Sequence, residues 1–202
     1  MRIRGVIFDL DGTLVDSRLD FDQMRREMGL PPGQPVLEAL VQLAGDEARR
    51  CWAILQRHEA AGARRATLIP GADELLLRLA ARGIRCGVFT RNSRRLTREV
   101  LGRLGLTVEP VVCREDGPVK PDPAGVLAIC RGWGLGTREV LVVGDFRFDI
   151  EAGRRAGART ALFTRGRDPA ELPFAAEADY VLASFTELEV AALLVWCNAP
   201  GD

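Results

Sequence analysis

The sequence predicts an α/β fold in which a parallel sheet carries helices on both faces and receives a small all-helical cap as an insertion. Three observations lead to this prediction. A buried-strand pattern occupies residues 3–9, close to the start of the 202-residue chain. From residue 69 onward, apolar runs of strand length alternate with amphipathic segments of helix length, as is typical of a parallel sheet. Between residues 17 and 68 the alternation fails and only helical patterns occur.

Six segments are expected to form the strands of the sheet. The first contains the apolar run Val6-Ile7-Phe8, which is typical of a buried strand. The later ones follow at intervals that leave room for a helix or a loop between them. The predicted strands are residues 3–9, 84–90, 109–113, 140–145, 160–164 and 180–183.

The helices between these strands are predicted from their end signals. Helices over residues 72–82 and 93–104 are followed by Gly83 and Gly105, because glycine readily takes the left-handed conformation that ends a helix. A helix over residues 123–133 has Asp122 as its cap and proline in its first turn. A last helix is predicted after Ser184, where Glu187 completes a capping box.

The insertion is predicted to be a separate helical cap over residues 17–68, leaving residues 1–16 and 69–202 as the core domain. Short amphipathic helices are expected near residues 19–30, 36–43 and 47–61, and Pro31-Pro32-Gly33 separates the first from the second. Asp16 and Ser17 are expected to cap the first of these helices.

The amino-acid composition limits the kinds of binding partner and cellular location that are expected. The 28 basic and 28 acidic residues cancel, so no overall charge attracts nucleic acid or a membrane, and we expect a small-molecule partner and a monomer or weak homodimer. The chain has no apolar run long enough to span a membrane and no signal-peptide pattern at its start, so a cytoplasmic location is expected. Its five cysteines include no close pair, which argues against a disulfide framework or a zinc site.

The first strand delivers two carboxylates to its C-terminal end. Asp9 and Asp11 lie where Gly12 allows the chain to turn. Two acids this close repel each other in a cleft of low dielectric constant. A cation, a proton or a phosphoryl group is therefore expected to be part of the site.

Other polar residues follow the later strands. In a parallel sheet, ligands bind beyond the C-terminal ends of the strands, so these residues are expected to converge. Lys120, in the segment after the third strand, is the only lysine among the 28 basic residues, which favours a role that needs a compact ammonium rather than a guanidinium. The other residues at these strand ends are Thr90, Arg91, Asn92, Asp145 and Asp149.

This ordered set resembles the haloacid dehalogenase superfamily, specifically its phosphatases that have a helical cap after the first strand. The resemblance covers essentially the whole chain and is loosest in the insertion. Within the superfamily, the chain is similar to phosphoglycolate phosphatases and other small-metabolite phosphatases. It implies a Rossmann-like core and a Mg²⁺-dependent phosphatase acting on a small phosphorylated metabolite. The matching residues are Asp9-Leu10-Asp11-Gly12-Thr13, Thr90, Lys120, Gly144-Asp145 and Asp149.

The resemblance also implies roles for the matching residues. Asp9 attacks phosphorus and forms an aspartyl phosphate. Asp11 protonates the leaving oxygen and later takes a proton from water. Mg²⁺ is held by the Asp9 carboxylate, the Asp11 backbone carbonyl and Asp145. Thr90 and Lys120 bind the phosphoryl oxygens as bonds break.

Residues around these positions have secondary roles in this interpretation. Asp149 is expected to orient Lys120 or a metal-bound water, and the N–H groups of Arg91 and Asn92 to add to the phosphate site. Phe146 and Phe148 depart from the family pattern, in which small or polar residues are expected at these positions.

Three alternatives to the phosphatase use part of the same set of residues. A phosphosugar mutase of the β-phosphoglucomutase type shares all the core motifs but keeps the phosphoryl group out of water. A phosphate-sensing or partner-binding module uses the same Asp, Thr and Lys chemistry as a switch. A dehalogenase uses the first aspartate without a metal, and the presence of Asp11, Thr90 and Asp145 argues against it.

Overall fold

The computed structural model describes residues 3–185 and contains a six-stranded sheet in which all neighbouring strands are parallel. This confirms the predicted α/β class. The strand order is β5-β4-β1-β6-β7-β8, so the first strand lies in the interior of the sheet. The strands are β1 (Gly5–Phe8), β4 (Arg85–Phe89), β5 (Val111–Val112), β6 (Val140–Gly144), β7 (Arg159–Phe163) and β8 (Tyr180–Leu182).

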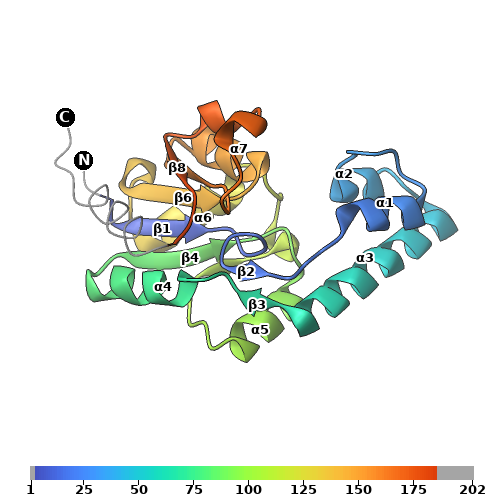
Figure 1. Cartoon of the computed structure of the whole chain (residues 1–202), viewed down its shortest axis with the longest axis horizontal. Helices are drawn as coiled ribbons and strands as arrows, with labels where there is room; N and C mark the ends of the chain where they lie inside the picture. Colours follow the sequence, from blue (N-terminus) through green and yellow to red (C-terminus); the bar gives the residue numbers. More distant parts are fainter. Residues whose placement is uncertain (1–2, 186–202) are drawn as a thin grey trace. The chain divides into compact units, whose positions relative to one another are not determined.

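Four helices of the core unit cover the two faces of this sheet. They are α4 (Ala72–Ala81), α5 (Arg94–Arg103), α6 (Ala124–Trp133) and α7 (Arg147–Ala156). One face is closed by α6 and α7, whose Ile129 and Ala152 belong to the same buried cluster as Ile7 of β1. Figure 1 shows α4 and α5 on the other side of the sheet from α7. Right-handed crossovers place α4 and α5 on the opposite face from α6 and α7, because the order in which the chain adds strands across the sheet reverses between β5 and β6.

The ends of the core helices follow the predicted signals. Gly83 and Gly105 have positive φ angles of 70° and 69° just beyond α4 and α5. The Asp122 carboxylate accepts a hydrogen bond of 2.8 Å from the backbone N–H of Ala124, the first residue of α6. Four short 3₁₀ segments complete the connections: Arg114–Asp116, Thr137–Glu139, Pro169–Glu171 and Ala175–Glu177.

Ser17–Ala66 forms a second compact unit, while Met1–Asp16 and Thr67–Asp202 form the first. The second unit consists of α1 (Phe21–Met28), α2 (Val36–Leu40) and α3 (Gly45–Arg65). Its own buried cluster is formed by residues of all three helices: Met24, Met28, Val36, Leu40, Cys51, Ile54 and Leu55. Amphipathic helices that share such a cluster can fold as a small bundle.

The boundary of the insertion differs from the expected one by two residues. Thr67 and Leu68 form strand β3 (Thr67–Leu68), which pairs antiparallel with β2 (Val15–Asp16). The sequence predicts no strand here, because a two-residue strand shows no periodicity. The two strands lie where the chain leaves the core and where it returns, so Thr67 and Leu68 belong with the core unit.

The cap of the first helix was also predicted wrongly. Asp20, rather than Asp16 or Ser17, precedes α1, and its carboxylate accepts a hydrogen bond of 2.7 Å from the N–H of Gln23. Asp16 instead pairs with Arg165 at 2.8 Å. Any of three nearby acidic or hydroxyl residues could have capped the helix, and only the start of the helix decides which one does.

One further expected strand is shorter than predicted, and one expected helix lies where the structure is not described. Strand β5 covers Val111 and Val112 rather than residues 109–113, because Pro110 has no N–H to donate to a neighbouring strand. The helix predicted after Ser184 lies outside the described residues. Within residues 3–185, every helix is too short or too polar to cross a bilayer.

Candidate active site

The candidate site lies at the C-terminal ends of three adjacent strands, β4, β1 and β6. Thr90 follows β4, Asp9 follows β1 and Asp145 follows β6. The N–H of Asp9 donates to the carbonyl oxygen of Val143 at 2.8 Å, so the β1–β6 pairing continues as far as the first carboxylate. The strand order therefore places residues that are far apart in the sequence along one short stretch of the sheet edge.

Lys120 joins two of the carboxylates. Its Nζ bonds to Oδ1 of Asp9, 111 residues away, and lies 2.5 Å from Oδ1 of Asp149. Lys120 is 2% exposed, Asp149 is 3% exposed and Asp9 is 9% exposed. A buried ammonium requires such partners, because an unpaired charge is strongly disfavoured away from water. The second oxygen of Asp149 accepts a hydrogen bond of 3.1 Å from the N–H of Phe146, which fixes the carboxylate at the start of α7.

Three carboxylates converge around this ammonium. Oxygen atoms of Asp9, Asp145 and Asp149 all lie within 4.8 Å of one another. Burial and repulsion between the carboxylates raise the pKa of Asp145 to about 7, against the pull of Arg167 and Lys120. Burial also raises the pKa of Asp9 well above its ordinary value, although Lys120 opposes the shift. The site therefore concentrates more negative charge than its own cations neutralise.

The charge state of Lys120 follows from the same geometry. Burial acts to lower the pKa of its ammonium, but the carboxylates of Asp149 and Asp9 outweigh burial and hold the pKa above its ordinary value. Lys120 is therefore a permanent cation in this site. Its Nζ also lies 5.5 Å from the ring centroid of Phe89, at the end of β4. A protonated lysine can stabilise negative charge on a phosphoryl group but cannot act as a base.

The second carboxylate of the first motif is held differently. The side-chain amide of Asn92 donates a hydrogen bond to Oδ2 of Asp11. The backbone N–H of Asn92 points to the hydroxyl of Thr90 at 3.2 Å. Asn92 therefore also contributes its side chain to the site, and the binding of phosphate by its N–H stays a prediction. Thr90 is buried at the end of β4, as expected.

Arg167 also contacts the site, at a position where no site residue is expected from the sequence. One of its guanidinium nitrogens lies 3.2 Å from the backbone oxygen of Asp145 and 3.8 Å from Oδ2 of the same residue. No sequence signal separates this residue from the many other arginines, because its role depends on how the loop after β7 returns to the end of β6.

Comparison with known proteins decides the family. Residues 3–157 match the haloacid dehalogenase-like hydrolases. The chain belongs to this family. It is 34% identical over 190 residues to the N-acetylmuramic acid 6-phosphate phosphatase of Pseudomonas putida, covering 82% of this chain and 85% of that protein. It is 33% identical over 188 residues to a phosphoglycolate phosphatase of Cereibacter sphaeroides, covering 80% of this chain and 85% of that protein.

A solved structure supports the same conclusion. A hydrolase from Pseudomonas syringae has a TM-score of 0.76 and 25% identity, with 95% of this chain and 99% of that chain covered. The resemblance inferred from the motifs is thereby confirmed. The chain is a haloacid dehalogenase-like hydrolase, and the two relatives place it among the phosphatases of this family.

The side chains present fit a divalent cation. Asp9, Asp145 and Asp149 offer hard oxygen donors close to one another, which is the donor type that Mg²⁺ prefers. The raised pKa of Asp145, to about 7, results in part from repulsion by Asp149, which a bound cation would relieve. Both oxygens of Asp149 accept hydrogen bonds, one from Lys120 and one from the N–H of Phe146, whereas Lys120 bonds to one oxygen of Asp9, so Asp9 and Asp145 have more capacity left for a metal.

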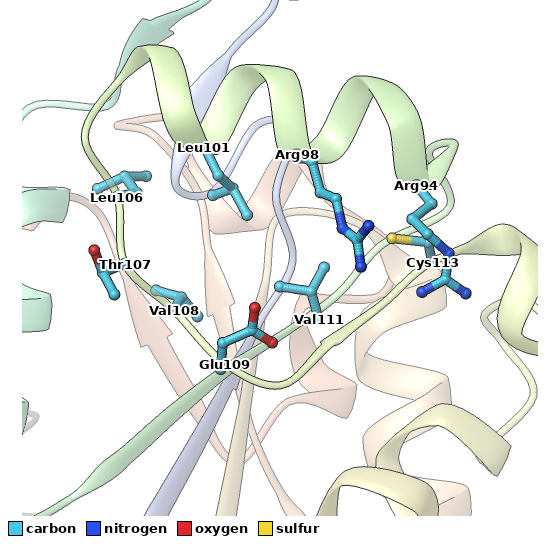
Figure 2. Close-up of a pocket in the computed structure, with 9 residues that line it drawn as sticks. All are labelled: Arg94, Arg98, Leu101, Leu106, Thr107, Val108, Glu109, Val111 and Cys113. Carbon is cyan, nitrogen blue, oxygen red and sulfur yellow. The ribbon is translucent and has the colours of Figure 1, made fainter.

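A cavity of about 370 Å³ lies away from this site. Figure 2 shows it between α5 and the segment that leads into β5, with Arg98 and Leu101 on the helix and Val108 and Val111 below them. None of the predicted site residues lines this cavity. The strand-end site is therefore defined by its side chains and not by this cavity.

Gly12→Ala is expected to disrupt the site. Gly12 has a φ of +89°, and an added Cβ would collide with the Asp145 carboxylate. We expect the free energy of unfolding to fall by about 2–4 kcal/mol, from positive-φ strain and steric overlap. Gly105→Ala is the matched control, because Gly105 also has a positive φ, +69°, but has open space around it. Urea denaturation of both variants should show the larger loss for Gly12→Ala; equal losses would contradict the close approach to Asp145.

Proposed function

We propose that the protein is a Mg²⁺-dependent phosphatase that hydrolyses a small phosphorylated metabolite through an aspartyl-phosphate intermediate. The observation that carries the proposal is the contact of Lys120 with both Asp9 and Asp149, beside Asp145. This arrangement gives a carboxylate nucleophile, a fixed cation and a group of oxygen donors in one place. Such a set is suited to phosphoryl transfer, which depends mainly on positioning and on charge stabilisation.

Asp9 is the proposed nucleophile. Its carboxylate attacks phosphorus, a bond forms between Asp9 and the phosphoryl group, and the bond to the leaving oxygen breaks. Asp11 gives a proton to that oxygen and then takes one from the water that hydrolyses the intermediate. The amide of Asn92 donates to Asp11 and so orients its carboxylate.

Thr90 and Lys120 are proposed to bind the phosphoryl oxygens. Lys120 is a buried cation that is already held by two carboxylates, so it needs little rearrangement during the reaction. The backbone N–H groups of Arg91 and Asn92 are proposed to add to the phosphate site. The guanidinium of Arg91 donates to the backbone carbonyl of Lys120 at 2.9 Å, which holds this segment beside Lys120. Asp149 orients Lys120.

Asp9, Asp145 and the backbone carbonyl of Asp11 would hold Mg²⁺. When bound, the metal polarises the phosphoryl group and offsets the charge of the surrounding carboxylates. Asp149 bonds to Lys120 and is the third carboxylate of the acidic cluster.

The relatives support a small substrate. One acts on N-acetylmuramic acid 6-phosphate and another on phosphoglycolate, and both are small phosphorylated metabolites. We propose a substrate of this class, with no role for nucleic acid or a membrane, and a monomer or weak homodimer in the cytoplasm. The cysteines within residues 3–185 are free thiols.

Chelation is expected to remove phosphatase activity reversibly. Phosphate release from p-nitrophenyl phosphate should fall by about 10²-fold or more in EDTA and return with excess Mg²⁺, because the carboxylate cluster repels an anionic substrate without a cation. Mg²⁺ should also raise the melting temperature of the protein, since it binds the folded state only. Full activity in EDTA would contradict the metal requirement.

A panel of phosphorylated metabolites tests the reaction type. Each is assayed for phosphate release, with and without a sugar bisphosphate. A phosphatase releases phosphate in every productive case. A mutase would show isomerisation that needs the bisphosphate and little free phosphate. A long-lived phosphoprotein without turnover would instead identify a phosphate-sensing module.

A further inference from the structure

A tight turn follows β7 and carries two arginines. The backbone N–H of Arg167 donates to the carbonyl oxygen of Thr164 at 3.1 Å, which closes a four-residue turn. The two central residues of this turn, Arg165 and Gly166, have φ angles of +56° and +80°. Positive φ at both central positions is characteristic of a type I′ turn, and glycine, asparagine or aspartate usually occupies them. An arginine at the first of these positions is therefore unusual.

The strained conformation of Arg165 is accompanied by a long-range ion pair. A residue with a Cβ atom is disfavoured at positive φ, so it stays there only where its surroundings fix it. The guanidinium of Arg165 pairs at 2.8 Å with the carboxylate of Asp16, which is 149 residues away in the sequence. Asp16 ends β2, in the same compact unit as the turn. The ion pair therefore helps to hold the turn against the core unit.

The side chain of Arg167 extends from this turn to Asp145. Its Nε donates to the backbone oxygen of Thr164 at 3.0 Å, and its Nη2 donates to the backbone oxygen of Asp145 at 3.2 Å. The same Nη2 lies 3.8 Å from Oδ2 of the Asp145 carboxylate. Thr164 follows β7 and Asp145 follows β6, so one guanidinium connects the ends of two neighbouring strands.

The Asp145 carboxylate is confined by a second neighbour. Gly12 approaches it so closely that an added Cβ would collide with the carboxylate. A ligand oxygen of Asp145 also lies within 4.8 Å of ligand oxygens of Asp9 and Asp149. With Gly12 and Arg167 both in contact with Asp145, its carboxylate has little freedom to turn. A ligand that is fixed before the ion arrives loses less conformational freedom on binding.

The geometry of Arg167 differs from that of a simple counter-ion. A guanidinium that neutralises a carboxylate typically bonds to it through two parallel N–H groups. Here the hydrogen bonds go to backbone oxygens, and the distance of 3.8 Å to Oδ2 of Asp145 is longer than a hydrogen bond. The segment that carries the carboxylate is therefore held, while the carboxylate oxygens stay available to a metal.

We propose that Arg167 is a positioning residue that holds Asp145 in the orientation in which it binds Mg²⁺, and that the Arg165–Asp16 ion pair supports it through the turn. The proposal rests on the proposed function, because it takes Asp145 to be a metal ligand. Arg167 is not a ligand itself, since a guanidinium is a donor only. Neighbours that orient a metal ligand in this way affect metal affinity strongly.

Calorimetric titration of metal-free protein with MgCl₂ tests the proposal. Arg167→Gln should raise the Mg²⁺ dissociation constant by about tenfold, because Asp145 then has to be ordered when the ion binds. A purely electrostatic effect has the opposite sign, since removal of a positive charge beside a cation site should tighten binding. Arg154→Gln is the matched control, because Arg154 pairs with Glu177 and should leave the dissociation constant unchanged.

Arg167→Lys separates geometry from charge. Lysine keeps the positive charge but has one nitrogen, so it cannot contact Thr164 and Asp145 as Nε and Nη2 do. This variant should bind Mg²⁺ nearly as weakly as Arg167→Gln. When Mg²⁺ is raised to about ten times the dissociation constant of each variant, kcat should return to within about threefold of the wild-type value, because Arg167 acts through the metal ligand.

Arg165→Gly tests the support given by the turn, and it remains informative if Arg167→Gln fails to fold. Glycine adopts positive φ without strain, so this variant keeps the turn but loses the ion pair with Asp16. The Mg²⁺ dissociation constant should rise about twofold or more. Urea denaturation in EDTA measures the stability of each variant separately from its metal affinity.

Three results would overturn the positioning role while leaving the phosphatase intact. They are unchanged or tighter Mg²⁺ binding in Arg167→Gln, full recovery of Mg²⁺ affinity in Arg167→Lys, and kcat that stays low at saturating Mg²⁺. An unchanged dissociation constant in Arg165→Gly would exclude the support by the ion pair. Absence of Mg²⁺ binding to the wild-type protein would contradict the metal site of the proposed function, and the positioning role with it.

Discussion

Asp9→Asn is expected to lower kcat for phosphomonoester hydrolysis by about 10³-fold or more. The substitution keeps the shape of the side chain but replaces a carboxylate oxygen with an amide oxygen, which is a much weaker nucleophile. Asp9 is the carboxylate that follows the interior strand β1 and bonds to Lys120. The measurement is kcat with p-nitrophenyl phosphate in saturating Mg²⁺.

The fold should survive this change. Loss of the Asp9 charge removes one partner of Lys120 but also relieves repulsion with Asp145 and Asp149. These effects oppose each other, so we expect the free energy of unfolding to change by about 1–2 kcal/mol at most. Asp73→Asn is the matched control, since Asp73 is exposed in the first turn of α4 and should leave kcat unchanged.

A trapping experiment separates a nucleophile from a residue that only binds metal. Wild-type protein mixed with substrate and quenched in acid should carry an acyl phosphate that hydroxylamine releases, and Asp9→Asn should carry none. Retention of a tenth or more of kcat in Asp9→Asn, or a phosphoprotein in that variant, would exclude Asp9 as the nucleophile.

Lys120→Met is expected to destabilise the fold and abolish activity. Lys120 is 2% exposed and neutralises Asp9 and Asp149. Its removal leaves two buried carboxylates without their cation, and the loss of one partner of a buried ion pair costs about 3–5 kcal/mol. Urea denaturation in the presence of EDTA measures this loss without rescue by a metal. Phosphate release should fall by about 10²-fold or more, because a charge-stabilising group is lost.

Two further variants test whether loss of the Lys120 ion pairs causes these losses of stability and activity. Lys120→Met combined with Asp149→Asn should be less destabilised than the sum of the two single variants, because each substitution removes the partner that the other leaves unpaired. Lys120→Arg keeps the positive charge but replaces a compact ammonium with a planar group, so it should recover stability better than activity. Additive single and double losses would show that Lys120 and Asp149 do not interact energetically.

The class of the fold could be predicted because its signals are local. The run Val6-Ile7-Phe8 is fully buried in β1, as an apolar run of strand length indicates. Gly83, Gly105 and Asp122 act at helix ends as expected, since they contact only residues a few positions away. The strand pair β2–β3 was missed because its two-residue strands are 52 residues apart from Val15 to Thr67 and carry no pattern.

The site could be predicted only in part, because only some of the contacts within it depend on local signals. The positions of Asp9, Thr90 and Asp145 at strand ends follow from the alternation of strands and helices, and Lys120 lies in the loop between β5 and α6. The contact of the Asn92 side chain with Asp11 and that of Arg167 with Asp145 did not follow from it. These contacts depend on how loops from different strands meet, and on side-chain orientations that a one-dimensional pattern does not contain.

The sequence by itself determined which residue types stand at the strand ends, including the first-strand carboxylates and a single lysine, and it determined that these strands are parallel. The tertiary structure alone decided that β4, β1 and β6 are neighbours, that Lys120 bonds to both Asp9 and Asp149, and that Arg167 contacts Asp145. The physical reason is the sequence separation over which each kind of interaction acts. Backbone preferences and periodicity act over a few residues, whereas strand order and ion pairing bring together groups that are up to 149 residues apart.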